Sequence, residues 1–372
     1  MSSFHQFSLL SSLVKSLSEQ GFTRPTDIQV RAIPPLMEGK GVVGVAETGS
    51  GKTLAYVLPM LHCLKVLETE GAPVSEPGRP RGLVLVPGRE LGAQVGKVFK
   101  SLTHGTRLRV RTVLGGTKKQ IARQNVAGNL EILVATPGRL LQLLDSRELR
   151  LDDVRMLIMD EADRLLDAGF LPVADRVLSS CPRGVQIGML SATFPQTLQG
   201  LLADVYDVPP VVVRTKGSGR MLATLTTDNR ALSKGARFEL LREVLNETVD
   251  GGTLLFANTR RQCEAVAEWL DDEGILYGRY MGEMDRRERT RNLERFRDGE
   301  LDLLLATDLG GRGIDIDRIA RVVNVHLPGD VDTYLHRAGR TARAGRPGVV
   351  VNFVTHRDEG LMQKLRKREQ RK

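Results

Sequence analysis

The chain has 372 residues, of which 41% are apolar and 27% are charged, and its formal net charge is +9. This composition is that of a globular protein, which excludes a disordered or collagen-like chain, and no run approaches the roughly 18 apolar residues of a membrane-spanning helix. Because the first residues lack a basic segment followed by an apolar one, and because three well-separated cysteines cannot all pair, we expect no secretory signal and a reducing, cytoplasmic compartment.

Short apolar runs alternate with longer helical patterns along the first half of the chain. The runs predict strands over Val42–Val45, Leu83–Val86, Val110–Val113, Ile132–Val134, Met156–Met159 and Ile187–Leu190. Helical patterns lie between them, for example over Lys52–Leu67 and Glu90–Leu102. This alternation predicts a parallel sheet with helices packed on it.

The same alternation resumes in the second half of the chain. Strands are predicted over Thr253–Phe256, Tyr277–Tyr280, Leu303–Leu305, Val322–Asn324 and Val349–Phe353. Residues 214–233 are rich in basic, glycine, serine and threonine residues, which favours a linker. We therefore predict two α/β domains in tandem, over residues 1–213 and 234–358, each a mostly parallel sheet flanked by helices, and a basic tail over residues 359–372.

The positive charge is concentrated in two places. The last twelve residues, Leu-Met-Gln-Lys-Leu-Arg-Lys-Arg-Glu-Gln-Arg-Lys, contain six basic residues and one acidic residue. They predict either a tail that binds nucleic-acid phosphates or a solvated helix end, and the sequence leaves both open. Residues 101–150 hold nine basic residues and three acidic ones, so a polyanion is first expected there in the body of the protein.

Residues 46–53, Ala-Glu-Thr-Gly-Ser-Gly-Lys-Thr, follow a predicted strand and precede a predicted helix, which is the context of a P-loop. Gly49 and Gly51 allow the backbone to approach phosphate oxygens, and the helix start adds free N–H groups. Lys52 is placed to bridge the β- and γ-phosphates of a nucleotide, and the Thr53 hydroxyl is placed to hold Mg²⁺. A flexible Gly/Ser loop is the weaker alternative.

Residues 156–163, Met-Leu-Ile-Met-Asp-Glu-Ala-Asp, form an apolar run that ends in acids. Asp160 fits the role of holding Mg²⁺ partly through water, and Glu161 fits that of orienting and deprotonating the attacking water. Acidic residues are also common at a helix N-terminus, but the P-loop upstream favours a nucleotide site.

Taken together, these motifs resemble those of the DEAD-box ATP-dependent RNA helicases of superfamily 2. Residues 160–163 spell the family name, and further family motifs follow in order across about residues 4–355. The resemblance implies two RecA-like domains, ATP and Mg²⁺ as cofactors and RNA as the partner, and nothing in the motifs requires more than a monomer.

The resemblance also implies roles at the nucleotide. Residues 21–29 resemble the adenine-reading Q motif, in which the amide of Gln29 suits the N6–H and N7 of adenine. Phe4 matches an upstream aromatic residue that stacks on the base, although a hydrophobic staple is the commoner role for such a residue, and Asp315 matches an acid that binds the ribose. The implied nucleotide-binding residues are Phe4, Phe22, Arg24, Gln29, Thr48, Gly49, Ser50, Gly51, Lys52, Thr53 and Asp315.

Two further motifs of the family are implied to connect hydrolysis with movement. Residues 334–345 resemble the HRxGRxxR motif, in which Arg340 and Arg343 would be arginine fingers and His336 would couple the domains. An added arginine of this kind contributes about 10³–10⁵ to the rate. Residues 191–193, Ser-Ala-Thr, resemble the motif that links hydrolysis to strand separation, and the hydroxyls of Ser191 and Thr193 could bond Asp163. The alternatives are a salt-bridged surface helix and a small-residue strand end.

The resemblance implies an RNA track over both domains. Its residues are Pro87, Arg89, Gly115, Gly116, Thr136 and Arg139 in the first domain, and Asn258, Arg260, Arg289 and Thr307 in the second. These residue types contact phosphate and sugar, so we expect binding that is largely independent of base sequence.

Several positions depart from the common family pattern. They are Glu47, Gly88, Gly92, Arg286, Gly310, Gly311 and His326, the last standing where an aspartate is usual. None is a residue assigned to ATP chemistry. They make RNA affinity and unwinding harder to predict than ATP hydrolysis.

We predict an RNA-stimulated ATPase that couples ATP hydrolysis to local unwinding of short RNA duplexes or to RNP remodelling, with ATP and RNA drawing the two domains together. An ATP-gated RNA clamp without useful unwinding is one alternative, motivated by Gly88 and Arg286. A DNA translocase is a second, which the Q motif and the RNA motifs disfavour. A scaffold role leaves the phosphate motifs unexplained. The sequence does not indicate the RNA target or the pathway.

Overall fold

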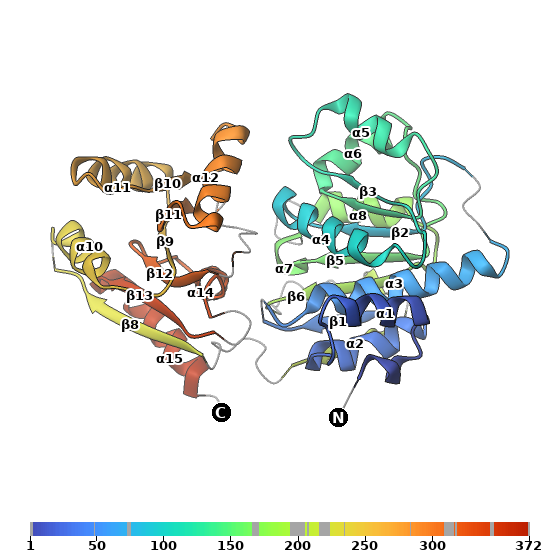
Figure 1. The fold of residues 1–372 in the computed structure, drawn as a ribbon, viewed down its shortest axis with the longest axis horizontal. Helices are drawn as coiled ribbons and strands as arrows, with labels where there is room; N and C mark the ends of the chain where they lie inside the picture. The colour runs from blue at the N-terminus through green and yellow to red at the C-terminus, as the bar shows by residue number, and fades with distance from the viewer. Residues whose placement is uncertain are drawn as a thin grey trace. The chain divides into compact units, whose positions relative to one another are not determined.

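A computed structural model describes residues 3–47, 49–72, 76–165, 171–193, 205–206, 208–215, 224–233, 235–282, 284–308, 316, 318–342 and 346–370. The chain divides into two compact units, residues 1–218 (unit 1) and 219–372 (unit 2). In each unit, helices cover both faces of a parallel sheet (Figure 1). Over the described ranges, no helix is long and apolar enough to span a membrane.

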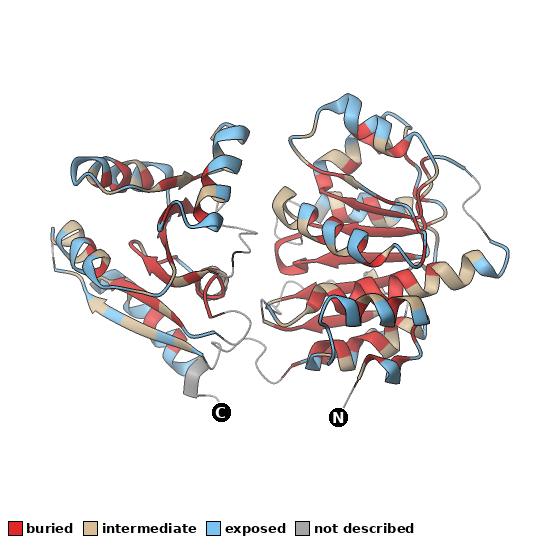
Figure 2. Ribbon diagram, viewed as in Figure 1, coloured by how far each residue is buried: buried red, intermediate tan, exposed pale blue. Residues whose placement is uncertain are grey.

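The described part of unit 1 contains a seven-stranded sheet in the order β3-β4-β2-β5-β6-β1-β7. All its strand pairs are parallel. Most of its strands are buried along their whole length, as expected for a parallel sheet with two covered faces (Figure 2). The strands are β1 (Val42–Val45), β2 (Gly82–Leu85), β3 (Val110–Val113), β4 (Ile132–Ala135), β5 (Met156–Asp160), β6 (Gln186–Ser191) and β7 (Val211–Arg214).

Two apolar clusters cover the two faces of this sheet. One face packs against a 3₁₀-helix, Phe4–Phe7, and against α1 (Ser11–Glu19), α2 (Asp27–Met37), α3 (Lys52–Thr69) and α4 (Arg89–Leu102). The other packs against α5 (Lys119–Val126), α6 (Pro137–Asp145), α7 (Ala162–Leu165) and α8 (Leu171–Ser180). Neighbouring strand residues such as Val42 and Val43 belong to opposite clusters, because side chains alternate across a sheet.

Unit 2 repeats this architecture with six strands among its described residues, in the order β10-β11-β9-β12-β13-β8. Every pair is again parallel. The strands are β8 (Leu225–Ala231), β9 (Gly252–Ala257), β10 (Gly278–Tyr280), β11 (Leu303–Thr307), β12 (Ile319–Asn324) and β13 (Gly348–Val354).

The helices of unit 2 also divide between the two faces of their sheet. Helices α10 (Arg237–Asn246) and α11 (Arg260–Asp272) bury apolar residues on one face. The other face carries α12 (Arg286–Asp298), α14 (Val331–Ala338) and α15 (Glu359–Gln370), the last preceded by a 3₁₀ turn at His356–Asp358.

The predicted fold class, two parallel α/β domains, is confirmed, and every predicted strand occurs within three residues of its predicted ends. Two strands were missed, β7 and β8, and both lie at sheet edges. Strand β8 falls inside residues 214–233, where we predicted a linker, so that prediction needs correction. Its sequence, LTTDNRA, is polar and half-exposed because an edge strand need not be apolar.

The predicted basic tail also needs correction, because residues 359–370 form α15. Leu361, Met362 and Leu365 are buried in an apolar cluster of unit 2. The basic residues Lys364, Arg366 and Lys367 are exposed. The segment is therefore an amphipathic helix of the domain that presents its positive charge to solvent.

Candidate functional site

The predicted motifs of unit 1 divide between the two halves of its sheet. The P-loop follows β1, the acidic motif ends β5, and the Ser-Ala-Thr motif ends β6. These three strands are neighbours in the order β5-β6-β1. The residues predicted to bind RNA follow β2, β3 and β4, which are neighbours in the other half, β3-β4-β2. Since ligands bind beyond the carboxyl ends of parallel strands, this edge offers two adjacent sites.

The P-loop connects β1 to the start of α3. Gly49 and Gly51 have φ of +81° and +88°, in the left-handed region that glycine adopts without strain. Lys52 is buried and is the first residue of α3. Its Nζ donates to the carbonyl oxygens of Ala46 at 2.5 Å and Glu47 at 2.9 Å. The loop thus curls around the ammonium group that would contact a phosphate.

Electrostatics at Lys52 reflect its burial among acids. Burial lowers the pKa of Lys52, while the nearby carboxylates of Asp160, Asp163 and Glu161 act in the opposite direction. Burial also raises the pKa of Glu47, one of the departures from the family pattern. An anionic phosphate beside Lys52 would stabilise its charged form.

Gln29 joins the Q motif to the P-loop. Its Oε1 accepts from the backbone N–H of Thr26 at 2.9 Å, and its Nε2 donates to the carbonyl oxygen of Gly51 at 3.0 Å. The first bond belongs to a capping box that begins α2. A Cβ on residue 51 would lie 2.4 Å from Gln29 Nε2, so only glycine fits there. One N–H and one lone pair of the Gln29 amide remain for a base.

The aromatic residues of the predicted adenine site differ in accessibility. Phe22 is 45% exposed, and Arg24 is also exposed. Phe4 is only 3% exposed and packs edge-on against Phe7 in the core, with ring centroids 6.1 Å apart. The ring of Phe4 is thus buried in this structure, and its predicted stacking on the base stays a prediction.

Asp160 ends β5 and is buried. Tyr56, one turn after Lys52 on α3, donates its hydroxyl to Asp160 Oδ2 at 2.8 Å, and the backbone N–H of Glu161 donates to Oδ1 at 2.9 Å. Burial, with a contribution from Glu161, raises the pKa of Asp160 to about 6, although the bond from Tyr56 and the charge of Lys52 act against the rise. A cation bound beside Asp160 would stabilise the charged form of this carboxylate.

Glu161 occupies an uncommon backbone conformation beside Asp160. Its φ is +53°, in the left-handed region, where a residue other than glycine is strained. Arg164 Nη1 donates to Glu161 Oε2 at 2.7 Å, and both side chains are nearly buried. The sequence prediction did not include Tyr56 or Arg164. Their spacing was the available signal, because residues three or four apart share a helix face.

Asp163 connects the acidic motif to the end of β6. The Thr193 hydroxyl donates to Asp163 Oδ2 at 2.7 Å, and the Thr193 backbone N–H donates to the same oxygen at 3.1 Å. The Ser191 hydroxyl accepts from the Thr193 N–H at 3.3 Å. The loop after β6 is thereby held to the loop after β5.

Two family models match the chain. One, described as DEAD/DEAH box helicase, matches residues 26–201, and one described as Helicase conserved C-terminal domain matches residues 236–345. The ATP-dependent RNA helicase SrmB of Haemophilus influenzae is 38% identical over 370 residues, which cover 99% of this chain and 83% of that protein. The chain belongs to the DEAD-box helicase family. ATP-dependent RNA helicase DBP2 of Saccharomyces cerevisiae is 36% identical over 359 residues, which cover 95% of this chain and 64% of that protein.

Two solved structures match this DEAD-box chain over its whole length. S. cerevisiae Dbp5 bound to RNA and ADP BeF3 matches with a TM-score of 0.87 and 26% identity, over 100% of this chain and 94% of that one. A DEAD box protein from the hyperthermophile Methanococcus jannaschii matches with a TM-score of 0.55 and 28% identity, over 100% and 98%. The RecA-like fold is thus shared by both units.

In unit 1 of this DEAD-box chain, Thr136 connects two of the segments that are predicted to bind RNA. Thr136 is the N-cap residue of α6, and its hydroxyl accepts from the backbone N–H of Gly115 at 2.9 Å. Arg139 on α6 donates to the carbonyl oxygen of Thr117 and, at 2.6 Å, to Gln142. Pro87 and Arg89 bracket the start of α4, and Gly116 has φ of +73°. Gly88 is the N-cap of α4 and makes no side-chain cap.

The RNA motifs of unit 2 likewise lie at the ends of neighbouring strands. Thr307 ends β11 and is buried, and Arg260 opens α11 after β9, where it pairs with Glu264 at 2.7 Å. Arg289 on α12 donates to the carbonyl oxygen of Gly282 at 3.2 Å and lies 5.7 Å from the ring centroid of Tyr280.

Arg337, a residue of the HRxGRxxR motif that the sequence prediction did not select, donates hydrogen bonds to four other residues. It is 2% exposed and forms a two-point ion pair with Asp308, at 2.5 and 2.7 Å. It also donates to the side chains of Asn324 and Asn258, at 2.9 and 2.8 Å, and to the carbonyl oxygen of His326 at 2.7 Å. One side chain thus joins the ends of β9, β11 and β12 to α14.

The structure describes only some of the remaining predicted site residues. Arg340 follows α14, is buried, and donates through Nε to the carbonyl oxygen of His336 at 3.1 Å. Thr48, Asp315 and Arg343, together with Gly310 and Gly311, lie outside the described residues. Their predicted roles stay predictions.

Proposed function

We propose that the chain is an RNA-stimulated ATPase that couples ATP hydrolysis to local unwinding of short RNA duplexes or to RNP remodelling. The observation that carries this proposal is the division of the unit 1 sheet edge, with the nucleotide motifs after β1, β5 and β6 and the RNA motifs after β2, β3 and β4. Membership of the DEAD-box family supports it.

The residues of unit 1 fit a nucleotide with Mg²⁺. Thr53 and Asp160 supply the oxygen ligands that this cation prefers. The raised pKa of Asp160 shows that burial disfavours its negative charge, which a bound cation would stabilise. When bound, Mg²⁺ neutralises charge on the β- and γ-phosphates. Lys52 binds the same phosphates, and Glu161, oriented by Arg164, takes up a proton from the attacking water.

Unit 2 would contribute arginines to the same nucleotide. We propose that Arg340 and Arg343 stabilise charge on the transferring phosphoryl group, with His336 as a coupling residue and Asp315 at the ribose. ATP and RNA would then each favour the state in which both units engage, which makes their binding mutually reinforcing.

The proposed RNA contacts are to phosphate and sugar. Backbone N–H groups, threonines and arginines supply them, so affinity should depend little on base sequence. The three cysteines are free, which supports a reducing compartment, and we propose that the protein works in the cytoplasm as a monomer.

The deciding measurement is ATP turnover by the full chain with and without single-stranded RNA. We expect RNA to raise turnover severalfold, DNA to have little effect, and Lys52→Ala to remove both the basal and the stimulated rates. Equal turnover with and without RNA would contradict the proposal.

An ATP-gated RNA clamp is the second candidate, since Gly88 offers no side chain where the family usually places a threonine. A strand-displacement assay on a short RNA duplex separates the two functions. A helicase releases the labelled strand in the presence of ATP, whereas a clamp hydrolyses ATP and retains it.

A further inference from the structure

The sheets of the two units have the same strand order. If β1 to β6 are matched in chain order with β8 to β13, the order β3-β4-β2-β5-β6-β1 becomes β10-β11-β9-β12-β13-β8, which is the order observed in unit 2. All pairings are parallel in both sheets. Each position at the carboxyl edge of one sheet therefore has a counterpart in the other.

The counterpart of the P-loop is the connection from β8 to α10. In unit 1, β1 leads to α3, whose first residue is Lys52. In unit 2, β8 leads to α10, whose first residue is the cation Arg237. The loops that face the P-loop in unit 1 follow β5 and β6, and their counterparts follow β12 and β13.

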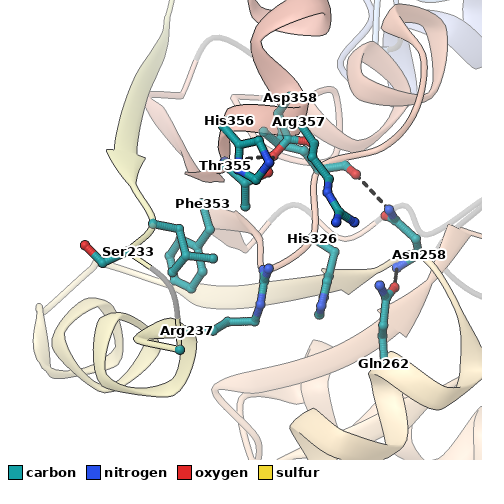
Figure 3. A pocket seen from close by; sticks show the side chains of 13 residues that line it. Ser233, Arg237, Asn258, Gln262, His326, Phe353, Thr355, His356, Arg357 and Asp358 are labelled. Carbon is teal, nitrogen blue, oxygen red and sulfur yellow. Dashed lines mark hydrogen bonds between the residues drawn. The ribbon is translucent and has the colours of Figure 1, made fainter.

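A cavity of about 580 Å³ lies at this position in unit 2 (Figure 3). Its walls come from the β8–α10 connection, from the ends of β12 and β13, and from the residues after β9. This volume is in the range of small-molecule sites. The lining combines apolar side chains with polar ones, among them Leu327, Arg237, His326, Asn258, Arg357 and Asp358.

The polar side of the cavity is cationic. Arg237 donates to the carbonyl oxygen of Val325, and it forms no ion pair with a described carboxylate, although the nearby charge of Asp358 partly offsets the lowering of the Arg237 pKa by burial. In Figure 3 the guanidinium groups of Arg237 and Arg357 and the ring of His326 lie around the same space. The lining acid, Asp358, accepts from the backbone N–H and hydroxyl of Thr355 at 2.8 and 2.6 Å, which disperses its charge.

His326 lines the cavity just beyond the end of β12. The counterpart strand β5 ends at Asp160 and is followed by Glu161, whereas β12 ends at Asn324 and is followed by Val325 and His326, so these positions carry no acid in unit 2. The His326 Nδ1 is buried and has no hydrogen-bond partner within the described part of the protein. Burial and the two arginines Arg237 and Arg337 lower the pKa of His326 to about 4, although the charge of Asp358 acts in the opposite direction, so the ring is neutral near pH 7 and does not repel either arginine.

We infer that this cavity of unit 2 binds a phosphate group of a small molecule, of mononucleotide size or smaller, without a metal ion. Arg237 and Arg357 supply the positive charge, and the neutral ring of His326 lies just beyond the end of β12, whose counterpart strand in unit 1 ends in a carboxylate. A phosphate is favoured over a cation because two arginines line the cavity, whereas its one carboxylate, Asp358, already accepts two hydrogen bonds from Thr355. The inference does not depend on ATP hydrolysis by unit 1.

The test is equilibrium binding of inorganic phosphate and of AMP to the full chain in the presence of EDTA, measured by calorimetry. The chain carries Lys52→Ala so that binding at the P-loop is weakened. We expect one site, whose affinity falls at least about tenfold in His326→Asp, which places a carboxylate beside the anion, and in Arg357→Gln, which removes an exposed cation. Arg242→Gln is the matched control, because Arg242 lies on α10 but pairs with Glu273 outside the cavity.

The two probes distinguish the source of the phosphate. Tighter binding of AMP than of phosphate that is lost in His326→Asp indicates a nucleotide in this cavity, equal binding of the two probes indicates the free anion, and tighter AMP binding that His326→Asp leaves unchanged belongs to the adenine site of unit 1 and counts against the inference. No binding of either probe at millimolar concentration overturns the inference, and so does binding that His326→Asp and Arg357→Gln leave unchanged. A circular-dichroism melt of each variant checks that it folds, and Arg357→Gln should fold normally because no bond of Arg357 with a described residue is lost.

Discussion

At the scale of single residues, the buried Asp160 of the nucleotide site lowers the free energy of unfolding when its carboxyl group is charged. Its folded pKa, about 6, lies above the ordinary value of 3.8. The folded state therefore holds a proton that the unfolded state has lost between about pH 4 and 6, and stability falls as the pH rises through that window. Above about pH 6 the buried carboxyl group of Asp160 is charged, and this charge makes the folded state less stable.

Asp160→Asn should consequently stabilise unit 1 while abolishing turnover. The gain over the parent chain should be small at pH 4, grow to pH 6, and reach about 3 kcal/mol at most above it. Urea unfolding at pH 5 and pH 8 measures this. Asp145→Asn, which removes an exposed partner of Arg176, should leave stability nearly unchanged at both pH values. Equal stability of parent and Asp160→Asn at pH 8 would sink the interpretation.

Tyr56 holds Asp160 in its charged form, which gives a second prediction. Removing the hydroxyl in Tyr56→Phe removes a bond that lowers the Asp160 pKa, so that pKa should rise further. We expect the acid limb of the kcat profile to move to higher pH, with the rate at high pH recovering. A uniform loss of rate at every pH would show that Tyr56 acts in some other way.

The sequence predicted the residues whose role lies within a short motif. Lys52, Asp160 and Thr193 are recognised from their neighbours, because each belongs to a short motif at the end of a strand or in the loop that follows it. It did not predict the bond between Tyr56 and Asp160, which are 104 residues apart, since that pairing exists only once α3 packs on β5. The same holds for Phe4, whose burial depends on how the whole N-terminal segment packs.

At the scale of elements, the polar edge strand and the buried arginine were the parts that the sequence did not predict. Strand β8 lacks an apolar run because half of its residues face solvent, so its composition is that of a linker. Arg337 lies in a recognised motif, but its partners Asp308, Asn324 and Asn258 come from three strand ends. Their convergence follows from the strand order, which composition and periodicity do not specify.

Arg337→Met should destabilise unit 2 strongly. Loss of the guanidinium leaves Asp308 and two asparagine side chains without their buried donor, and breaking a buried pair on one side destabilises by about 3–5 kcal/mol. Chemical unfolding followed by the fluorescence of Trp269, which lies in unit 2, reports this loss. Arg295→Met is the control, because Arg295 pairs with Glu300 at the surface. A change below 1 kcal/mol for Arg337→Met would show that the network is not a structural tie.

At the scale of the whole molecule, each unit has its own apolar clusters on both faces of its sheet. Units with separate cores can unfold separately. The destabilisation by Arg337→Met should therefore be confined to the transition that Trp269 reports.

The distribution of charge gives the last prediction. Lys364, Arg366 and Lys367 are exposed on α15, while Leu361 and Leu365 of the same helix are buried. Deleting residues 361–372 would remove part of the core, so a loss of RNA binding after deletion would be uninformative.

Replacing Lys364, Arg366 and Lys367 with glutamine leaves that core intact. If α15 contacts RNA phosphates, the triple variant should bind RNA more weakly at low salt, and the slope of log affinity against log salt should fall by up to about 2, since each lost contact with a single strand contributes roughly 0.7. Fluorescence anisotropy with labelled single-stranded RNA over a salt series measures the slope. Glutamine at Lys40, Arg155 and Arg183 is a control of equal charge, because these exposed residues precede β1, β5 and β6 and so lie at the opposite edge of the sheet from the residues predicted to bind RNA. If the α15 variant keeps the slope of the parent chain, the positive charge of α15 solvates the helix and does not contact RNA.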